Sequence, residues 1–371
     1  MQKLLFTAST YSHILNFHLP YLQYFEQQGW TLHLACGGEK ASVPHVSELI
    51  HLPLEKSMTS PKNFRAAAML REKINQESYS LIITHTALAA FFTRAALWGL
   101  RDRPPLINMV HGYLFDEQTP YIKQRLLLTA EEWTASQTDL LITMNQWDYH
   151  FAAQRQLGRR VSVVPGVGVD FSRFDRPPAR PELRKDFGIP QDAFLLLYPA
   201  EFSARKSQPV LIRAMAELPE DVFLVLAGDG RTRTECESLA EALGLQNRIL
   251  FPGHQQDMAS WYAVASAAVT SSRIEGMPFN VMEAMYTGLP VVASAVKGHT
   301  DLISHETTGL LYPYGDSTAC AAQIQRLITD PSLCRRLSDA AGSNIRHYRL
   351  DEVFPIVLNE YLSLLPDYIP A

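Results

Sequence analysis

The chain has 371 residues, of which 47% are hydrophobic and 19% are charged, and its formal net charge is −5. This composition is typical of a globular protein long enough for about two domains, and it includes no strongly basic block of the kind that nucleic-acid-binding proteins carry. The sequence contains no run of about 18 apolar residues, so it predicts no transmembrane helix.

The cysteines show neither disulfide spacing nor metal-ligand spacing, and a reducing cytoplasm is their simple interpretation. They are Cys36, Cys236, Cys320 and Cys334. The apolar stretch at residues 1–8 is too short for a signal peptide and is interpreted as a first buried strand. Residues 1–170 carry 15 Lys and Arg against 14 Asp and Glu, whereas the remainder carries 18 against 24. This mild asymmetry is compatible with an N-terminal half that approaches an anionic surface.

The first half of the chain alternates apolar runs with helical patterns. Runs at 3–8 and 31–36 flank a helical pattern at 17–28, and further strands are predicted at 81–84, 106–110 and 140–144. This order predicts an α/β domain with a parallel sheet. A loop is predicted at 9–16, at the carboxyl end of the first strand, where open α/β sheets bind ligands. Ser12 and His13 could contact a substrate there, or His13 could hydrogen-bond the loop backbone.

His111 and Gly112 directly follow the strand predicted at 106–110. A histidine in this position lies over the edge of the sheet, but on its own such a residue is more often structural than catalytic.

Helical patterns at 88–100 and 121–133 mix large apolar residues with basic ones. The second could lie on a membrane, with Lys123 and Arg125 on anionic headgroups, or it could simply cover the sheet.

A second domain is predicted after the Pro-rich, polar linker at 177–184. Gly166 and Gly168 do not open a helix, so they form no dinucleotide-binding fingerprint. The strand at 194–199 is followed by a loop that ends in Arg205 and Lys206. Two cations between a strand and a helix suit a diphosphate, although a solvated charge pair is the alternative. Strand and loop patterns recur at 223–230 and 249–257.

Residues 271–290, SSRIEGMPFNVMEAMYTGLP, hold two glutamates eight positions apart. The small apolar run at 265–272 predicts a buried strand, Pro278 suits the first turn of a helix, and Gly288 is placed to end that helix. The start of a helix favours an anion, phosphate above all. Glu275 then lies beside the anion, and Glu283 lies about one and a half turns into the helix, near a more distant part of the ligand. A helix start with an acidic first turn is the alternative.

The same stretch resembles the E-x₇-E motif of the family 4 retaining glycosyltransferases, in the form E-G-[MFL]-P-x-x-x-x-E. The T-G-x-P-V-V-A-S segment at 287–294 is also usual in that family, and the similarity extends from about residue 2 to 362. The segments SHILNFHLP and HG resemble those of a branch that builds capsular polysaccharides, exopolysaccharides and lipid-linked glycans. The resemblance implies a GT-B fold, in which two Rossmann-like domains face a cleft.

The implied domains are an acceptor-side domain at 1–172, with the C-terminal helix at 346–371 packing back on it, and a sugar-nucleotide domain at 186–345. The implied reaction is transfer of a sugar from a nucleotide sugar, expected to be a UDP-sugar, to an acceptor hydroxyl with retention. The expected acceptor is a glycan linked to polyprenyl diphosphate, and peripheral contact with an anionic membrane is expected. A sugar-nucleotide epimerase, a glycan phosphorylase and a non-catalytic sugar-nucleotide-binding subunit are the alternatives.

The resemblance also implies a role for each candidate residue. Glu275 and His111 are the expected catalytic residues, and Glu283 is expected on the ribose of the nucleotide. The diphosphate is expected on Arg205, Lys206, Gly276 and Met277. The donor sugar is expected on His111, Glu275, Met277, Pro278, Phe279 and Asn280, the nucleobase near Gly253 and His254, and the acceptor near Ser12 and His13.

Two departures from the family qualify these expectations. Many members carry a Gly-Gly pair in the first loop, and this chain does not. Many also carry G-R-L-x-x-x-K before the diphosphate, whereas this chain reads A-E-F-S-A-R-K at 200–206, with Glu201 at the usual Arg position. We expect Arg205 to replace the missing cation and Glu201 to point away, where it could pair with a neighbouring base. The sequence contains no D-x-D pair, so no metal and no cofactor are expected for the transfer.

Overall fold

The computed structural model describes residues 2–116, 119–176, 180 and 182–366. The chain divides into two compact units, which we call unit 1 (residues 1–168 and 351–371) and unit 2 (residues 169–350). Residues 169–186 belong to unit 2 because Phe171 and Leu183 are buried in its core. Part of the linker predicted at 177–184 lies outside the described residues, namely 177–179 and 181.

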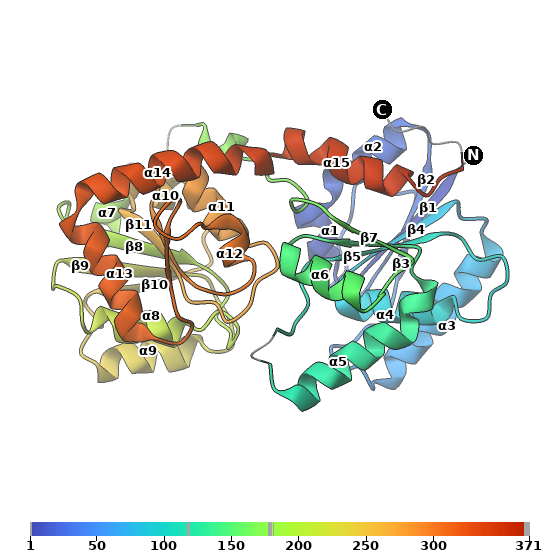
Figure 1. Ribbon diagram of the computed structural model, residues 1–371, viewed down its shortest axis with the longest axis horizontal. Coiled ribbons are helices and arrows are strands. Elements are labelled where there is room, and N and C mark those ends of the chain that lie inside the picture. Colours follow the sequence, from blue (N-terminus) through green and yellow to red (C-terminus); the bar gives the residue numbers. More distant parts are fainter. Residues whose placement is uncertain (1, 117–118, 177–179, 181, 367–371) are drawn as a thin grey trace. The chain divides into compact units, whose positions relative to one another are not determined.

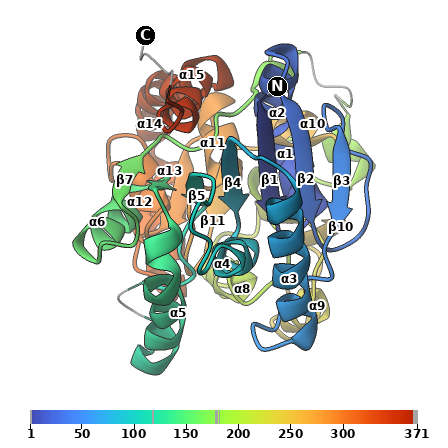
Figure 2. The same ribbon diagram turned by 90° about the vertical axis from the view of Figure 1, so that its right-hand side faces the viewer.

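Unit 1 is built on a seven-stranded parallel sheet in the part of the chain that the structure describes, with the order β3-β2-β1-β4-β5-β6-β7 (Figures 1 and 2). The central strands are buried almost throughout, as expected for parallel strands covered on both faces. The strands are β1 (Lys3–Ala8), β2 (Thr31–Cys36), β3 (Glu48–His51), β4 (Leu81–His85), β5 (Leu106–Val110), β6 (Leu140–Thr143) and β7 (Arg160–Val163).

The loop predicted at 9–16 is wrong, because most of it is helix. Thr10 is the N-cap, and its side chain accepts a hydrogen bond from the backbone N–H of His13, which starts a helix directly after the first strand. The helices of unit 1 are α1 (Tyr11–Phe17), α2 (Leu19–Gln27), α3 (Pro61–Gln76), α4 (Ala87–Ala96), α5 (Tyr121–Thr134), η1 (Ala135–Gln137), α6 (Gln146–Gln154) and α15 (Leu350–Leu362).

The C-terminal helix α15 packs on unit 1 through aromatic side chains. Tyr361 is fully buried, lies edge-on to Phe6 of β1, and donates its hydroxyl to the sulfur of Met109 in β5. Phe354 stacks on Tyr21 of α2. Burying an aromatic side chain of this kind contributes roughly 1.5–3 kcal/mol. The apolar face of α15 therefore belongs to the core of unit 1, although the sequence reaches it only after all of unit 2.

Unit 2 has a six-stranded parallel sheet in the described residues, with the order β10-β9-β8-β11-β12-β13. Its strands are β8 (Phe194–Pro199), β9 (Val222–Ala227), β10 (Ile249–Gly253), β11 (Ala267–Thr270), β12 (Val291–Ser294) and β13 (Leu310–Tyr312). Its helices are η2 (Ser172–Phe174), α7 (Leu183–Asp186), α8 (Gln208–Met215), α9 (Arg233–Ala242), α10 (Met258–Val264), α11 (Phe279–Tyr286), α12 (His299–Leu302), α13 (Ser317–Thr329), α14 (Pro331–Ile345) and η3 (Arg346–Tyr348).

Both sheets reverse their strand order at the first strand. In unit 1 the reversal lies between β1 and β4, and in unit 2 it lies between β8 and β11. In open α/β sheets, the connections that leave the carboxyl ends of such neighbouring strands diverge and create a ligand-binding crevice. The loops after these four strands are therefore where functional side chains are expected in each unit.

Candidate active site

At the strand-order reversal of unit 2, two cations converge on one carboxylate. Arg205 and Lys206 follow β8, and Glu275 follows β11. Arg205 Nη1 donates to Glu275 Oε2 at 2.9 Å, and Lys206 Nζ donates to Glu275 Oε1 at 2.6 Å. The structure thus brings together the three charged residues that the sequence predicted separately.

The two loops that carry these residues are tied to each other through the backbone. The N–H of Arg273 donates to the carbonyl of Arg205 at 2.8 Å. The hydroxyls of Ser271 and Tyr198 each donate to the carbonyl of Lys206 at 3.0 Å. Because these bonds fix the main chain on both sides, the positions of the charged side chains follow from the sheet and not from exposed loop conformations.

Burial alone would raise the pKa of Glu275, but Lys206 and then Arg205 outweigh it and hold that pKa at about 2. The carboxylate is therefore ionised at neutral pH even though its side chain is only 6% exposed. Buried charges of this kind persist only when they are paired. An anionic ligand that reached Arg205 and Lys206 would share these two cations with Glu275.

Glu201 pairs with Arg205, the base that was expected to bind the diphosphate. Arg205 Nη2 lies 3.1 Å from Glu201 Oε1, while its other terminal nitrogen holds Glu275. The expected pairing with a neighbouring base is thus present, but the base is Arg205 itself. Lys206 has only Glu275 as its ion-pair partner among the described residues, and its side chain is 12% exposed against 37% for Arg205.

The helix predicted after Glu275 is α11. Pro278 is its N-cap residue and Phe279 its first residue, so the backbone from Gly276 onward approaches the amino end of the helix. Gly288 follows the C-cap with a φ of +78°, which is the left-handed conformation that glycine adopts most readily. Met277 and Phe279 pack partly against the core of unit 2, and the carbonyl of Asn280 accepts from the hydroxyl of Tyr262.

Gly298, which was not predicted as a site residue, lies against the loop of Glu275. Gly298 has a φ of +82°, and a Cβ atom there would lie 2.8 Å from both Glu275 Cβ and the carbonyl oxygen of Gly276. The N–H of Gly298 donates to Asp301. Gly228 and Gly230, in the turn after β9, allow a similarly close approach to the loop before Arg205. A Cβ atom at either glycine would lie about 2 Å from a backbone oxygen of that loop.

Glu283 lies on α11 and has partners of its own. Arg173 forms an ion pair with Oε1, and the hydroxyl of Tyr262 donates to Oε2 at 3.0 Å. Burial raises the pKa of Glu283 above its ordinary value, and Arg173 and Tyr262 oppose that rise. The Arg173 side chain is 57% exposed and that of Glu283 is 10% exposed, so the pair joins a surface cation to a buried carboxylate. Neither partner was predicted from the sequence.

The region expected to receive the nucleobase lies at the end of β10. Gly253 is in the left-handed conformation with a φ of +76°, and the N–H of His254 donates to Asp229 Oδ2 at 2.9 Å. Asp229 also forms an ion pair with Arg233. The backbone at His254 is thus held by the turn after β9.

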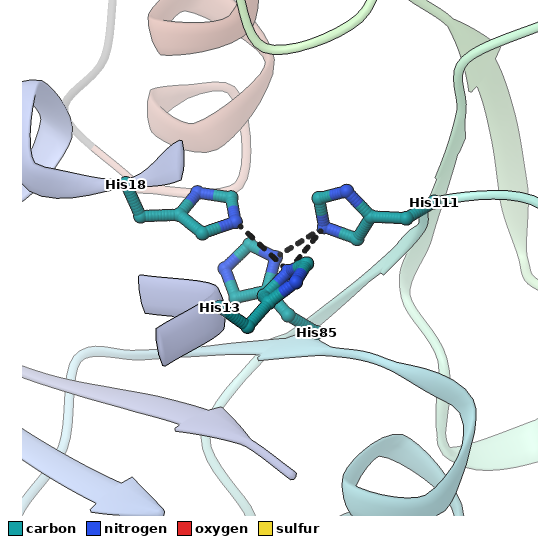
Figure 3. A group of neighbouring side chains, drawn as sticks. All are labelled: His13, His18, His85 and His111. Carbon is teal, nitrogen blue, oxygen red and sulfur yellow. Dashed lines mark hydrogen bonds between the residues drawn. The ribbon is translucent and has the colours of Figure 1, made fainter. Parts of the chain in front are cut away.

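In unit 1, the predicted residues His13 and His111 come together with two further histidines, His18 and His85 (Figure 3). His13 Nε2 lies 3.2 Å from His111 Nε2. Burial lowers the pKa of His13 to about 4, and it lowers the pKa of the other three well below the ordinary value, with neighbouring imidazoles adding to the effect. All four rings are therefore neutral at neutral pH. Ser12 is exposed, and its hydroxyl donates to Thr10.

Helix α5 exposes an unusual amount of apolar surface next to basic side chains. Tyr121, Ile122, Leu126 and Trp133 are 58–83% exposed. Lys123 and Arg125 on the same helix are also exposed. The helix is fixed to α4 from its other face by the buried pair of Arg94 and Glu131, at 2.9 Å. None of the described helices is long and apolar enough to cross a membrane.

Comparisons with known proteins agree with this architecture. The putative glycosyltransferase EpsD of Bacillus subtilis is 34% identical over 343 residues, which cover 91% of this chain and 90% of that protein. The D-inositol 3-phosphate glycosyltransferase of Xylanimonas cellulosilytica is 32% identical over 322 residues, covering 80% and 75%. The Anabaena protein HepE, solved in complex with UDP and glucose, superposes with a TM-score of 0.80 at 21% identity, covering 98% of this chain and all of that one.

The sequence also matches two family descriptions that together span most of the chain. Residues 21–173 match Glycosyltransferase Family 4, and residues 179–343 match Glycosyl transferases group 1. The fold similarity to HepE and to sucrose-phosphate synthase of Thermosynechococcus elongatus, with a TM-score of 0.80 at 22% identity over 98% and 99% of the two chains, is that of the GT-B architecture. The chain therefore belongs to the family 4, group 1 glycosyltransferases and has their GT-B fold.

Proposed function

We propose that this protein transfers a sugar from a UDP-sugar to a hydroxyl group of a glycan acceptor, with retention at the anomeric carbon. The observation that carries the proposal is the buried carboxylate of Glu275, held by Arg205 and Lys206 where the strand order of unit 2 reverses. Arg205 and Lys206 supply positive charge, and Glu275 supplies negative charge. Each is opposite in sign to a charge that develops during the reaction. The departing diphosphate becomes more negative, and the sugar becomes oxocarbenium-like.

The diphosphate of the donor would bind Lys206 and Arg205. Both cations donate to one anion, Glu275, at 2.6–2.9 Å, so their donors are directed at the same place. The backbone N–H groups at the start of α11, near Gly276 and Met277, would add to the positive potential. Together these groups would replace the divalent cation that many diphosphate sites use.

Glu275 would then hold hydroxyls of the donor sugar and stabilise positive charge at its anomeric carbon. Its low pKa suits this role because a carboxylate must stay ionised to stabilise a cation. The segment from Met277 to Asn280 would line the sugar. The backbone near Gly253 and His254 would face the nucleobase.

Glu283 would bind the ribose hydroxyls. Both of its oxygens already accept hydrogen bonds, so a ribose would have to share Oε1 with Arg173 or displace that side chain. Arg173 is exposed and can move into solvent, whereas Glu283 is buried, so the ribose hydroxyls would have to replace the hydrogen bond that Arg173 donates.

For unit 1, we propose that His111 contributes a neutral imidazole to donor-sugar binding and that the region of Ser12 and His13 serves the acceptor. The family resemblance supports these roles, and the lowered pKa of His111 agrees with a neutral ring. The exposed apolar and basic side chains of α5 would rest on an anionic membrane surface, which fits an acceptor carried on polyprenyl diphosphate.

The choice of donor and process comes from relatives. HepE of Anabaena was solved with UDP-glucose, and the name of LpsD of Rhizobium meliloti, 36% identical over 215 residues, refers to lipopolysaccharide core biosynthesis. LpsD matches only 57% of this chain and 60% of its own length. We therefore propose surface polysaccharide biosynthesis as the process and a UDP-hexose or UDP-N-acetylhexosamine as the donor.

A donor and acceptor screen tests this proposal. The purified protein is incubated with individual UDP-sugars and GDP-mannose together with polyprenyl-diphosphate-linked sugars, and the products are read by mass and by the anomeric coupling in their NMR spectra. We expect UDP release that depends on acceptor and a product with the anomeric configuration of the donor. UDP-sugar binding without any transfer to acceptors would favour a binding subunit, and conversion of the donor to its epimer would overturn the transferase assignment.

A further inference from the structure

Four imidazole rings from segments far apart in the sequence of unit 1 lie together, with one nitrogen of each ring close to those of the others (Figure 3). His13 lies on α1, His18 joins α1 to α2, His85 ends β4, and His111 follows β5. One nitrogen of each ring lies within 4.8 Å of the corresponding nitrogen of every other ring. The separations are 3.3 Å between His18 and His13, 3.2 Å between His13 and His111, and 3.2 Å between His111 and His85.

Hydrogen bonds between the rings cannot satisfy this arrangement. Each imidazole nitrogen has one in-plane position, which holds either a hydrogen or a lone pair. The three contacts run in series from His18 to His13, from His13 to His111 and from His111 to His85. His13 Nε2 and His111 Nε2 therefore each have two neighbours but only one such position. At most two of the three contacts can be linear N–H···N bonds, and the third is then left without a bond because both of its nitrogens have already used their single position. Polar groups at this depth normally have partners.

We propose that these four histidines bind one tetrahedral transition-metal ion, with Zn²⁺ as the preferred ion. A single cation accepts all four lone pairs at once, which pairwise bonds cannot do. Zinc–imidazole bonds of about 2.0–2.1 Å in a tetrahedron place the ligand nitrogens about 3.3–3.4 Å apart. The three separations of 3.2–3.3 Å approach that value before any ion is added.

The spacing and the ligand type argue against other ions. Square-planar coordination, which Cu²⁺ and Ni²⁺ favour, would bring neighbouring nitrogens to about 2.8–2.9 Å. Mg²⁺ and Ca²⁺ require oxygen ligands, and the cluster offers none. The other group of possible ligands in the described residues, His33 with Glu48 and Glu77, is already neutralised, since Lys73 contacts both carboxylates and Lys3 contacts Glu77.

Four protein ligands close the coordination shell, so the ion would act as a structural centre and not as a catalyst. It would fix the start of α2 and the carboxyl ends of β4 and β5 to α1. The hydrogens of His18 and His85 would move to their second ring nitrogens, Nδ1 and Nε2, which are buried and have no protein partner among the described residues. His111 would keep only Nδ1 for any contact with a sugar.

Metal binding can be measured without donor or acceptor, so the result is independent of the proposed transfer. The protein is stripped with a chelator, incubated with excess Zn²⁺, passed over a desalting column, and analysed for metal by mass spectrometry. We expect about one zinc per chain, and a rise in melting temperature on adding Zn²⁺. Replacement by Co²⁺ should give the intense visible absorption of a tetrahedral site.

Two variants assign the site, and a third serves as control. His18→Ala and His85→Ala should each lower zinc affinity by at least tenfold, whereas His33→Ala removes a buried histidine of unit 1 outside the cluster and should not. X-ray absorption of the zinc-loaded unmodified protein should show imidazole nitrogens at about 2.0 Å, and this measurement needs no variant that folds. Zinc that fails to bind, that stays bound in both cluster variants, or that has sulfur or mainly oxygen ligands would overturn the proposal.

Discussion

The two units use one strand order and place opposite chemistry at the same point of it. Where β1 and β4 meet, unit 1 gathers four neutral imidazoles, and where β8 and β11 meet, unit 2 gathers two cations and a carboxylate. Burial penalises charge in both places. In unit 1 it lowers the pKa values of the histidines, whereas in unit 2 the opposite charges are close enough to keep Glu275 ionised. The fold supplies the position, and the side chains decide what can bind there.

The largest expected effect comes from removing the negative charge of Glu275 in unit 2. Glu275→Gln should lower turnover by roughly 100-fold or more, because one well-placed electrostatic group is typically worth that much in a transition state. The variant keeps the shape of the side chain, and its melting curve checks that it folds. Glu241→Gln, on the exposed face of α9, is the matched control and should transfer at the normal rate. Normal turnover in folded Glu275→Gln would remove Glu275 from the mechanism.

A somewhat smaller effect should distinguish the two cations. Lys206→Ala should weaken UDP-sugar binding by about 1.5–3 kcal/mol, the range for a charge-assisted hydrogen bond. Arg205→Ala should cost less than Lys206→Ala, because Arg205 is more exposed and is shared with Glu201. Isothermal titration measures both.

Glu201→Gln provides the control for this pair, since it releases Arg205 without removing it. We expect UDP-sugar binding that is equal or tighter in that variant. Unchanged binding in Arg205→Ala would mean that Lys206 works without a second cation from this loop.

The histidine cluster of unit 1 is neutral, whereas helix α5 of the same unit carries exposed cations. Their contribution to membrane binding can be tested separately. Replacing Lys123 and Arg125 together by Ser should weaken binding to anionic liposomes by about 2 kcal/mol, at roughly 1 kcal/mol for each charge, and high salt should weaken it as well. Co-sedimentation measures the bound fraction. Replacing Lys185 and Arg213 of unit 2 by Ser changes the net charge equally and should have little effect. Undiminished binding of the α5 variant would indicate another surface.

A smaller effect is expected from His299, a buried imidazole behind Glu275. Burial lowers the pKa of His299 to about 4, against the usual value near 6.5. As the pH falls below about 6.5, His299 becomes protonated in the unfolded chain but stays neutral in the folded one. Protonation therefore favours the unfolded chain, and the contribution of His299 to stability is lost between about pH 6.5 and 4. Between pH 7 and 5.5 the loss should be about 1 kcal/mol.

His299→Gln should remove that part of the pH dependence. Hydrogen exchange of the amides in β12 and α12 can report the opening free energy of unit 2 at both pH values. If the unmodified protein and His299→Gln lose the same stability over this interval, another group must be titrating.

The smallest expected effect is that of added divalent ions on transfer. If Arg205, Lys206 and the start of α11 carry the charge of the diphosphate, Mg²⁺ and Mn²⁺ should not change the rate. The assay compares the rate in excess chelator with the rate after Mg²⁺ or Mn²⁺ is added in excess of the chelator. Activity that chelation abolishes and that Mg²⁺ or Mn²⁺ restores would contradict the prediction, whereas restoration by Zn²⁺ alone would indicate the histidine cluster.

Parts of both units could be predicted from local sequence. The strands at 194–199 and 106–110 have the predicted bounds, since runs of buried apolar residues between turn signals specify strands locally. The loop, helix and glycine end at 271–290 also match, because Pro278 and Gly288 act on the backbone within a few residues. Helix α1 was missed because the cap at Thr10 was not recognised.

The remaining features depend on tertiary structure. His13, His18, His85 and His111 span almost a hundred residues, and only the order of β1, β4 and β5 in the sheet places them together. Arg173 reaches Glu283 across 110 positions, and Gly298 matters only because another backbone passes within van der Waals distance of it. Local sequence determines strands, helix starts and the types of side chain at strand ends. Which of those ends meet is decided by packing the sheets, since burial of their apolar faces is non-directional and depends on the whole chain.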